Sequence, residues 1–203
     1  MGRRAAARTV KRRELPAAPP ASRLYAYVID WALGGIVSGL PAVLAFAALR
    51  RDGSMLGTLY DFEATGYPQA VGVAVAVACL ACAVAYFVVV PWVVWPGQTP
   101  GKRVAKLRVV GPGDATVGLG RLLVRQVLVG LVLEGSGFVA ARYLRELAVL
   151  ITRVDVNFYW EWAGLVITAV SAVLAFALPA HRALHDYVAG TRVVPAEGHP
   201  LAA

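Results

Sequence analysis

Hydrophobic residues in this chain occur in long blocks rather than at the regular intervals of a soluble helix or strand. Residues 24–49 and 70–95 are mainly apolar, and residues 159–180 are apolar apart from Glu161 near one end. A transmembrane helix needs about 20 mainly apolar residues, and a longer block can tilt to fit the bilayer. The pattern therefore predicts membrane-spanning helices at these three positions.

The segment between the second and the last block allows two interpretations. Residues 127–141, VLVGLVLEGSGFVAA, are mostly apolar, but Glu134 lies in the middle of them. One interpretation places a third span near 119–140, so that the chain has four spans. The other lays residues 119–152 along the membrane interface as amphipathic helices, with three spans and an external C-terminus.

Composition and the placement of charge favour the four-span arrangement. The chain has 203 residues, of which 59% are hydrophobic and 16% charged, against about 45–50% and 25% in an ordinary soluble domain. Basic residues gather before the first span and in residues 96–118, and Arg182 and Arg192 follow the last span. Because Lys and Arg concentrate in cytoplasmic loops, all three regions are expected in the cytoplasm, which requires an even number of spans. We predict an all-α polytopic helical bundle in the plasma membrane, with a cytoplasmic N-terminus.

The two ends of the chain are expected to lie outside this membrane domain. Residues 1–20 are basic and rich in Ala and Pro, which predicts a disordered tail. Residues 21–194 form the predicted membrane domain, and residues 195–203 form a second tail. A basic tail before an apolar block is also typical of a secretory signal peptide, but the roughly 7–15 apolar residues of such a peptide are far fewer than those found here.

The positive charge has a further consequence for binding partners. Its concentration next to the spans argues against nucleic acid as a partner. A solvated tail that sets the topology is the simplest interpretation, and binding of anionic lipid headgroups is an added one. The bilayer itself is the first expected partner.

No motif indicates an enzyme. Residues 96–103, PGQTPGKR, resemble a phosphate-binding loop, but that motif needs four residues between its glycines and Ser or Thr after the lysine. Gly97 and Gly101 have three residues between them, and Arg103 follows Lys102. His181 and His185 would share one face of a helix, yet no further His or Cys accompanies them as a metal site requires. We therefore expect no enzymatic activity, no metal and no cofactor.

Two short segments have the composition of β-strands. VAKLRVV at 104–110 leads into a Gly/Pro turn, and TRVV at 191–194 lies near the C-terminus. We predict a short cytoplasmic β segment, in which these two stretches could pair.

The first span contains one buried carboxylate, that of Asp30. Arg23 and Asp30 are seven residues apart, so they share one helix face and lie about 10.5 Å apart along the axis. This face also carries small residues, so Asp30 is expected to point into the bundle. Four small residues of this span let a neighbouring helix approach closely: Gly34, Gly35, Ser38 and Gly39.

Three motifs occur in a fixed order along the chain. Arg23-x-x-Ala26-x-x-x-Asp30 opens the first span, and GQTPGKRVAKLRVV (97–110) follows the second, leading into LGRLLVRQ (119–126). LHDYVAGTRVV (184–194) closes the domain. In this combination the chain resembles the RDD family of integral membrane proteins, which is named for one arginine and two aspartates. The resemblance covers residues 23–194.

The resemblance implies which residues carry the function. The family arginine corresponds to Arg23, the two aspartates to Asp30 and Asp186, and Arg125 to an arginine common in the helix after the GQTPGKR segment. Glu134 is not part of the pattern. The other motif positions are Gly97, Gln98, Thr99, Gly101, Lys102, Arg103, His185, Gly190 and Thr191.

Two functions are compatible with this pattern. A central aspartate costs roughly 2.5–3.5 kcal/mol in a membrane helix, so it is kept only if it is protonated, paired or used. The resemblance implies transport, in which Arg23, Asp30, Asp186 and Arg125 bind a cation or exchange it for protons. The alternative is a packing lock in a non-transporting structural or assembly partner of a membrane protein complex. Because four spans are few for a transporter, we expect a homo-oligomer or a membrane-protein partner. Arg125 and Asp186 are the first candidate partners of Asp30.

Overall fold

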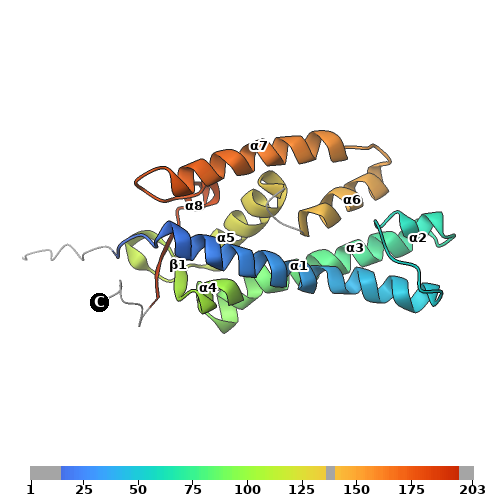
Figure 1. Ribbon diagram of the computed structural model, residues 1–203, viewed down its shortest axis with the longest axis horizontal. Helices are drawn as coiled ribbons and strands as arrows, with labels where there is room; N and C mark the ends of the chain where they lie inside the picture. Colours follow the sequence, from blue (N-terminus) through green and yellow to red (C-terminus); the bar gives the residue numbers. More distant parts are fainter. Residues whose placement is uncertain (1–14, 136–139, 197–203) are drawn as a thin grey trace, which may run out of the picture.

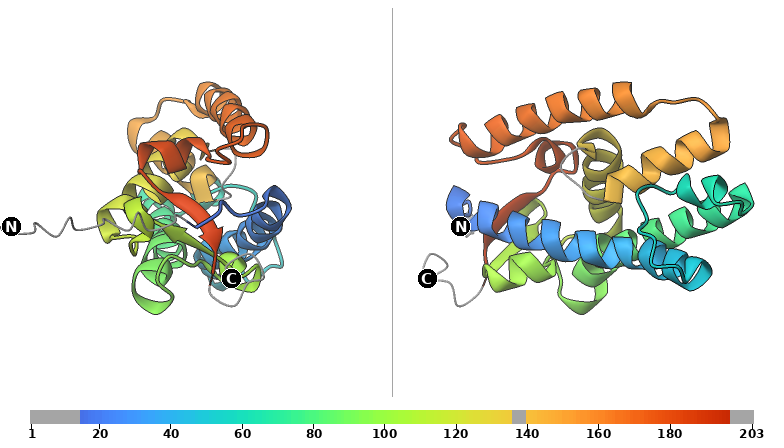
Figure 2. Two further views of the ribbon diagram at one scale, coloured as in Figure 1. Left: turned by 90° about the vertical axis from the view of Figure 1, so that its left-hand side faces the viewer. Right: turned by 45° about the vertical axis from the view of Figure 1, so that its right-hand side comes forward.

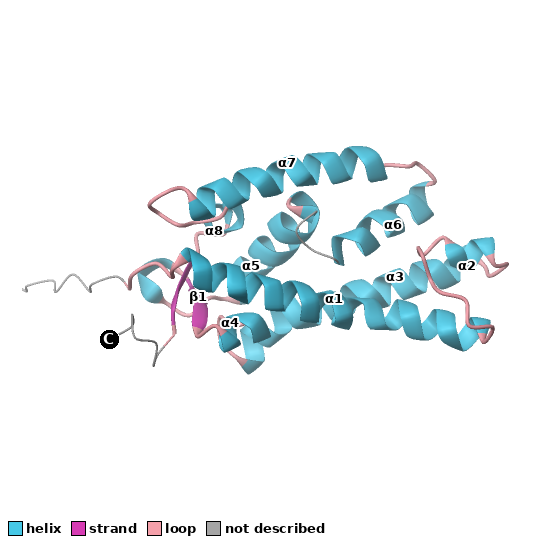
Figure 3. Cartoon of the chain, viewed as in Figure 1, coloured by secondary structure: helices cyan, strands magenta, loops and turns pink. Residues whose placement is uncertain are grey.

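The computed structural model describes residues 15–135 and 140–196, so most of the two predicted tails lies outside the described residues. The chain forms a helical bundle with a small sheet at one end (Figures 1 and 3). Among the described residues, three helices are long and apolar enough to cross a membrane. They are α1 (Pro20–Arg50), the continuous helix of α3 (Gln69–Val84) and η1 (Ala85–Val94), and α7 (Asn157–Phe176). The all-α polytopic membrane fold is confirmed.

α1 packs on the bundle through a narrow stripe of small side chains. Residues four apart lie on the same face of a helix, and the stripe follows that spacing. Gly34 lies so close to the ring of Phe87 in η1 that an added Cβ would be 2.4 Å from a ring carbon. Asp30 is part of the stripe and points into the bundle. The buried residues of α1 are Ala26, Asp30, Gly34, Ser38, Ala42 and Phe46.

A two-stranded antiparallel sheet lies next to both the first and the last segments of the membrane domain. β1 (Leu107–Val110) pairs with β2 (Arg192–Pro195). The backbone N–H of Ala18, just before α1, donates to the carbonyl of Val193 at 3.0 Å. The start of α1 and the C-terminal strand therefore lie at the same end of the bundle, which we call the sheet end (Figure 2).

The last residues before α1 are ordered, although the tail was expected to be disordered up to residue 20. The backbone N–H of Leu15 donates to the carboxylate of Asp114 at 3.0 Å. Asp114 closes the short helix η2 (Pro112–Asp114). The sheet end thus holds residues 15–19 through contacts with distant segments.

The opposite end of the bundle holds α2 (Asp61–Ala64), and we call it the α2 end. The guanidinium of Arg153, just before α7, forms two hydrogen bonds of 2.8 Å with the carboxylate of Glu63. Arg142 donates to the carbonyl of Gly57 at 2.7 Å. The segment that leads into α7 has therefore reached the α2 end.

Residues 119–152 cross the bundle in two pieces, which corrects the predicted single span at 119–140. α5 (Leu119–Leu122) continues into the π-type helix η3 (Leu123–Leu133), and α6 (Ala140–Thr152) completes the crossing. Since α7 returns the chain to the sheet end, the chain passes along the bundle four times. The alternative with residues 119–152 along the membrane interface differs from the structure as well. With three spans it would leave the C-terminus at the α2 end, whereas the C-terminal strand lies at the sheet end.

α7 explains why the third crossing is interrupted. The hydroxyl of Thr168 donates to the carbonyl of Glu134 at 2.8 Å, and the indole N–H of Trp160 donates to the carbonyl of Val132 at 2.9 Å. The last carbonyls of a helix need such partners when no further turn follows. Side chains of α7 replace the next helical turn, so η3 can end at Leu133 inside the bundle.

Candidate functional site

Asp30 is buried and is held by four hydrogen-bond donors. Its Oδ1 accepts from the hydroxyl of Tyr86 at 3.0 Å and from the backbone N–H of Gly101 at 2.8 Å. Its Oδ2 accepts from the hydroxyl of Thr99 and from Nζ of Lys102 at 3.4 Å. We call these five residues the Asp30 cluster. Three of the four donors come from the GQTPGKR segment, so the carboxylate anchors that segment to α1.

The local sequence prepares the GQTPGKR segment for this contact. Thr99 caps the short helix α4 (Pro100–Val104) by accepting from the backbone N–H of Lys102, and Pro100 occupies its first turn. Gly97 has a φ of 76°, which a side chain would make unfavourable. A Cβ on Gly101 would lie 2.3 Å from the carbonyl oxygen of Ala26. The motif residues thus let α4 lie directly against α1.

Asp186, in α8 (Leu184–Val188), forms a second cluster. Its carboxylate accepts from Nη2 of Arg23 at 2.9 Å, from Nη1 of Arg125 and from the hydroxyl of Thr191 at 3.1 Å. The backbone N–H of Ala183 adds a fourth donor at 3.2 Å. We call these five residues the Asp186 cluster. It ties α1, η3 and the C-terminal segment together.

Opposite charges determine the protonation of Asp186. Burial by itself would raise the pKa of Asp186, but the positive charges of Arg125, His185 and Arg23 outweigh it and hold that pKa well below its usual range. Burial lowers the pKa of Lys102, and the charge of Asp30 opposes this shift. Asp186 therefore stays ionised whenever the protein is folded near neutral pH.

The depressed pKa of Asp186 predicts acid sensitivity. A carboxylate with a lowered folded-state pKa stabilises the protein fully above its unfolded value of about 3.9, and this stabilisation is lost as the pH falls through the folded value. We expect the thermal unfolding midpoint of the detergent-solubilised protein to be steady from about pH 7 to 5 and to fall below about pH 4. Glu63→Gln, which removes the exposed pair at the α2 end, is expected to keep this profile. A midpoint that does not change down to pH 3 would contradict the prediction.

Glu134 forms a third polar contact, which motif reasoning set aside. Its Oε2 lies 2.8 Å from Nδ1 of His185, and its Oε1 accepts from the hydroxyl of Ser171 at 2.5 Å. The hydroxyl of Ser171 in turn accepts from the backbone N–H of Leu184 at 3.0 Å. A carboxylate within an apolar stretch was the available signal in the sequence. The structure shows that it joins the end of η3 to α7 and α8.

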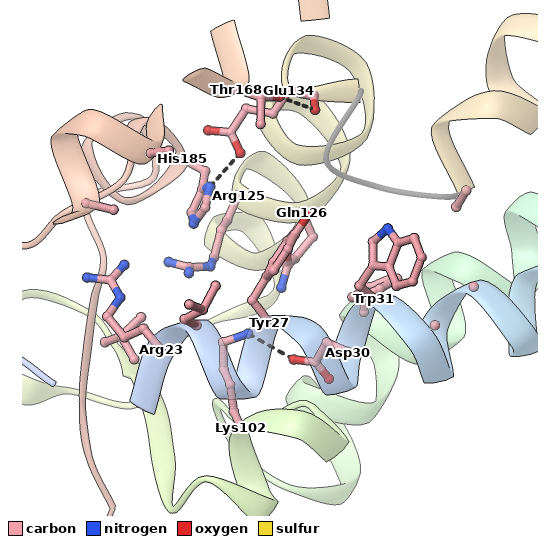
Figure 4. Close-up of a pocket in the computed structure, with 18 of the residues that line it drawn as sticks. Arg23, Tyr27, Asp30, Trp31, Lys102, Arg125, Gln126, Glu134, Thr168 and His185 are labelled. Carbon is pink, nitrogen blue, oxygen red and sulfur yellow. Dashed lines mark hydrogen bonds and ion pairs between the residues drawn. The ribbon is translucent and has the colours of Figure 1, made fainter. Parts of the chain in front are cut away.

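A cavity of about 330 Å³ lies between α1, η3 and α7. Figure 4 shows Arg23, Lys102 and Arg125 around one side of it, and Glu134 with Thr168 on the other. Gly35, one of the predicted packing residues, also lines it, whereas Gly39 lies near Tyr143 of α6. The charged residues that line the cavity are Arg23, Asp30, Lys102, Arg125 and Glu134, and His185 lies with them.

The structure therefore divides the predicted Arg/Asp set in two. Arg23, Arg125 and Asp186 come together, but Asp30 is bound by Lys102 and its neighbours instead of Arg125 and Asp186. Arg125 and Asp186, the first candidate partners of Asp30, are not among the residues that bind its carboxylate. The donors to Asp30 lie 56 to 72 residues away in the sequence, which no local spacing could reveal.

The remaining motif residues support the same contacts. The side-chain amide of Gln98 donates to the carbonyl of Leu107 at 2.8 Å, and the guanidinium of Arg103 lies 4.7 Å from the ring centre of Trp95. Gly190 has a φ of 62° at the turn before Thr191. The first contact ties the GQTPGKR segment to β1, and the second ties α4 to the end of η1.

His181 and His185 do not share a helix face, because His181 lies before the start of α8. The carbonyl of His181 accepts a hydrogen bond from Arg23. Within residues 15–135 and 140–196, no group of three or more His, Cys, Asp and Glu side chains could hold a metal ion.

The fold and the site together define a class of protein. This is a multi-pass helical membrane protein in which an arginine and two aspartates tie the first span to two motif segments at the sheet end. The family model described as the RDD family matches residues 17–190, most of the chain, so the protein belongs to the RDD family. Comparisons with curated proteins and with solved structures gave no match.

Proposed function

We propose that this RDD protein is a non-transporting structural or assembly partner of a membrane protein complex, and that its Arg/Asp set acts as a packing lock. One observation carries the proposal: Asp30 and Asp186 are each bound by four donors that the fold holds in place. A carboxylate that binds a cation in transit needs free oxygen ligands. Both aspartates would have to release fixed partners first.

The charges around the cavity support the same conclusion. Arg23, Lys102 and Arg125 all line it, and like charges a few ångströms apart repel strongly in an environment with little water. A metal cation that enters the cavity would meet these three groups, and it would have to displace Lys102 from Asp30 or the two arginines from Asp186. Cation binding is therefore the less favourable use of this site.

One observation favours transport as a second candidate. The pair of Glu134 and His185 lines the cavity, and a carboxylate next to an imidazole can accept and release a proton. Exchange of a proton for a cation would then use this pair rather than the family aspartates. Glu134→Gln would abolish it while leaving both aspartate clusters in place.

We place the sheet end in the cytoplasm of a cell with the protein in its plasma membrane. Arg50, Arg51, Arg142 and Arg153 mark the α2 end, whereas the basic residues of the sheet end are more numerous, and positive loops remain inside. The sheet end carries Lys102, Arg103, Lys106, Arg108, Arg121, Arg182 and Arg192.

The replacement Asp30→Asn tests the lock. It removes the charge that compensates Lys102, and we expect the free energy of unfolding in detergent to fall by about 2 kcal/mol. This is less than for a fully buried pair, because the Lys102 side chain is 16% exposed and can reach water. In proteoliposomes, neither wild type nor Asp30→Asn is expected to move protons in response to a cation gradient above protein-free vesicles.

Two outcomes separate the candidates. Cation-driven proton flux in wild type that disappears in folded Asp30→Asn would refute the lock proposal. Flux that survives Asp30→Asn but is lost in Glu134→Gln would support the second candidate instead. The control is Asp52→Asn, which changes a half-exposed carboxylate and is expected to alter stability by no more than about 0.5 kcal/mol.

A further inference from the structure

The cavity extends a considerable way along the first span. On α1 its lining runs from Arg23, near the sheet end, to Gly35, or about 18 Å at 1.5 Å per residue. Its volume of about 330 Å³ lies within the range of roughly 300–1,000 Å³ that is usual for ligand sites. Neither aspartate cluster needs a space of this size.

One side of the cavity carries excess positive charge. Asp186 is shared by Arg23 and Arg125, so these three groups together retain one positive charge. Lys102 and Asp30 neutralise each other. Glu134 lies on the opposite side of the cavity (Figure 4). The arginine side is therefore suited to an anion.

Arg125 carries a donor that the described residues leave unsatisfied. Its Nη1 binds Asp186 and Thr191, but its Nε is buried and has no hydrogen-bond acceptor among residues 15–135 and 140–196. The Arg125 side chain is 3% exposed, so bulk water cannot satisfy this group. A buried donor without an acceptor costs about 1–3 kcal/mol, so the Arg125 guanidinium keeps hydrogen-bonding capacity that Asp186 and Thr191 do not use.

Part of the remaining lining is apolar and exposed. Leu24, Tyr27 and Trp31 of α1 are between 44% and 51% exposed, and Phe176 of α7 is 43% exposed. α1 and α7 are both membrane-spanning helices, so these side chains face the acyl chains of the bilayer. The opening between them suits an apolar chain that continues from a charged headgroup.

We propose that this cavity binds an anionic membrane lipid. Its phosphate lies at Arg23 and Arg125, near the sheet end where headgroups are found, and an acyl chain follows α1 toward Gly35. Charge and apolar surface occur together along one helix, which a free anion would not require. The proposal adds a ligand to the cavity and does not depend on whether the protein transports ions.

The experiment titrates detergent-solubilised protein with phosphatidylglycerol, phosphatidylcholine or inorganic phosphate and follows binding by native mass spectrometry and by the thermal unfolding midpoint. Ala172→Phe is designed to fill the cavity from α7, and Ala172 belongs to neither aspartate cluster. Val173→Phe, the neighbouring change, is the matched control because Val173 is 59% exposed and does not line the cavity.

Phosphatidylglycerol is expected to bind wild type and Val173→Phe, raise their unfolding midpoints, and bind Ala172→Phe at least about tenfold more weakly. Phosphatidylcholine and inorganic phosphate are expected to bind at least about tenfold more weakly than phosphatidylglycerol to wild type. Equal binding of phosphatidylglycerol by both variants would overturn the cavity as its site. Equal effects of inorganic phosphate would overturn the lipid as its ligand.

Discussion

Replacing Asp186 with asparagine is expected to lower the free energy of unfolding by about 3–5 kcal/mol, the cost of leaving a buried ion pair without one partner. Arg23 and Arg125 would lose the charge that compensates them. Their side chains are 9% and 3% exposed, so water cannot take its place. The amide keeps one accepting oxygen in place of two, and it neutralises neither guanidinium.

The loss is expected to appear first in the C-terminal segment. Asp186 holds α8 and Thr191 against η3, and β2 follows immediately. Limited trypsin digestion in detergent should therefore cut at Arg182 and Arg192 faster in Asp186→Asn than in wild type, and the unfolding midpoint should fall.

The control for this prediction is Asp155→Asn. Asp155 lies in the exposed loop before α7 and accepts only from the neighbouring Asn157 among the described contacts. This variant is expected to match wild type in both measurements. If Asp186→Asn were as stable and as resistant to trypsin as Asp155→Asn, the Asp186 cluster would not hold the C-terminal segment.

The second large loss of stability is expected for Gly101→Ala. The added methyl group should push α4 away from α1. A Cβ there would lie 2.3 Å from the carbonyl oxygen of Ala26 and 2.7 Å from Cγ of Asp30. The first contact is with helix backbone, which cannot turn aside as a flexible side chain can. Gly101→Ala is expected to cost about 3 kcal/mol or more, at the upper end for overpacking, since it also displaces the hydrogen bond from Gly101 to Asp30.

Gly120→Ala is the matched control for this change. Gly120 lies in α5 and has nothing within 4 Å of an added Cβ, so alanine should be neutral or stabilise the helix by up to about 1 kcal/mol. Unfolding midpoints of the two variants in the same detergent make the comparison. Equal stability of Gly101→Ala and Gly120→Ala would show that α4 is not packed closely against α1.

The broken third crossing shows where sequence reasoning reached its limit. The apolar stretch of residues 127–141 predicted a span of ordinary length. Glu134 in its middle was the one local indication that this helix is interrupted. η3 ends at Leu133 because Thr168 and Trp160 of α7 take up its last carbonyls. These residues lie 34 and 28 positions away from their partners, so nothing local in the sequence specifies the break.

The sequence by itself determined that the chain is a polytopic membrane protein, where its three long spans lie, and that Asp30 points into the bundle. These features follow from the length of apolar blocks and from helical periodicity, which depend on neighbouring residues. Only the tertiary structure decided which cation neutralises which carboxylate. Arg23 and Asp186 are 163 residues apart, and Lys102 and Asp30 are 72 apart. Buried charges require partners that are close in space, not close in sequence. The ion pairs are therefore determined only when all four crossings have packed together.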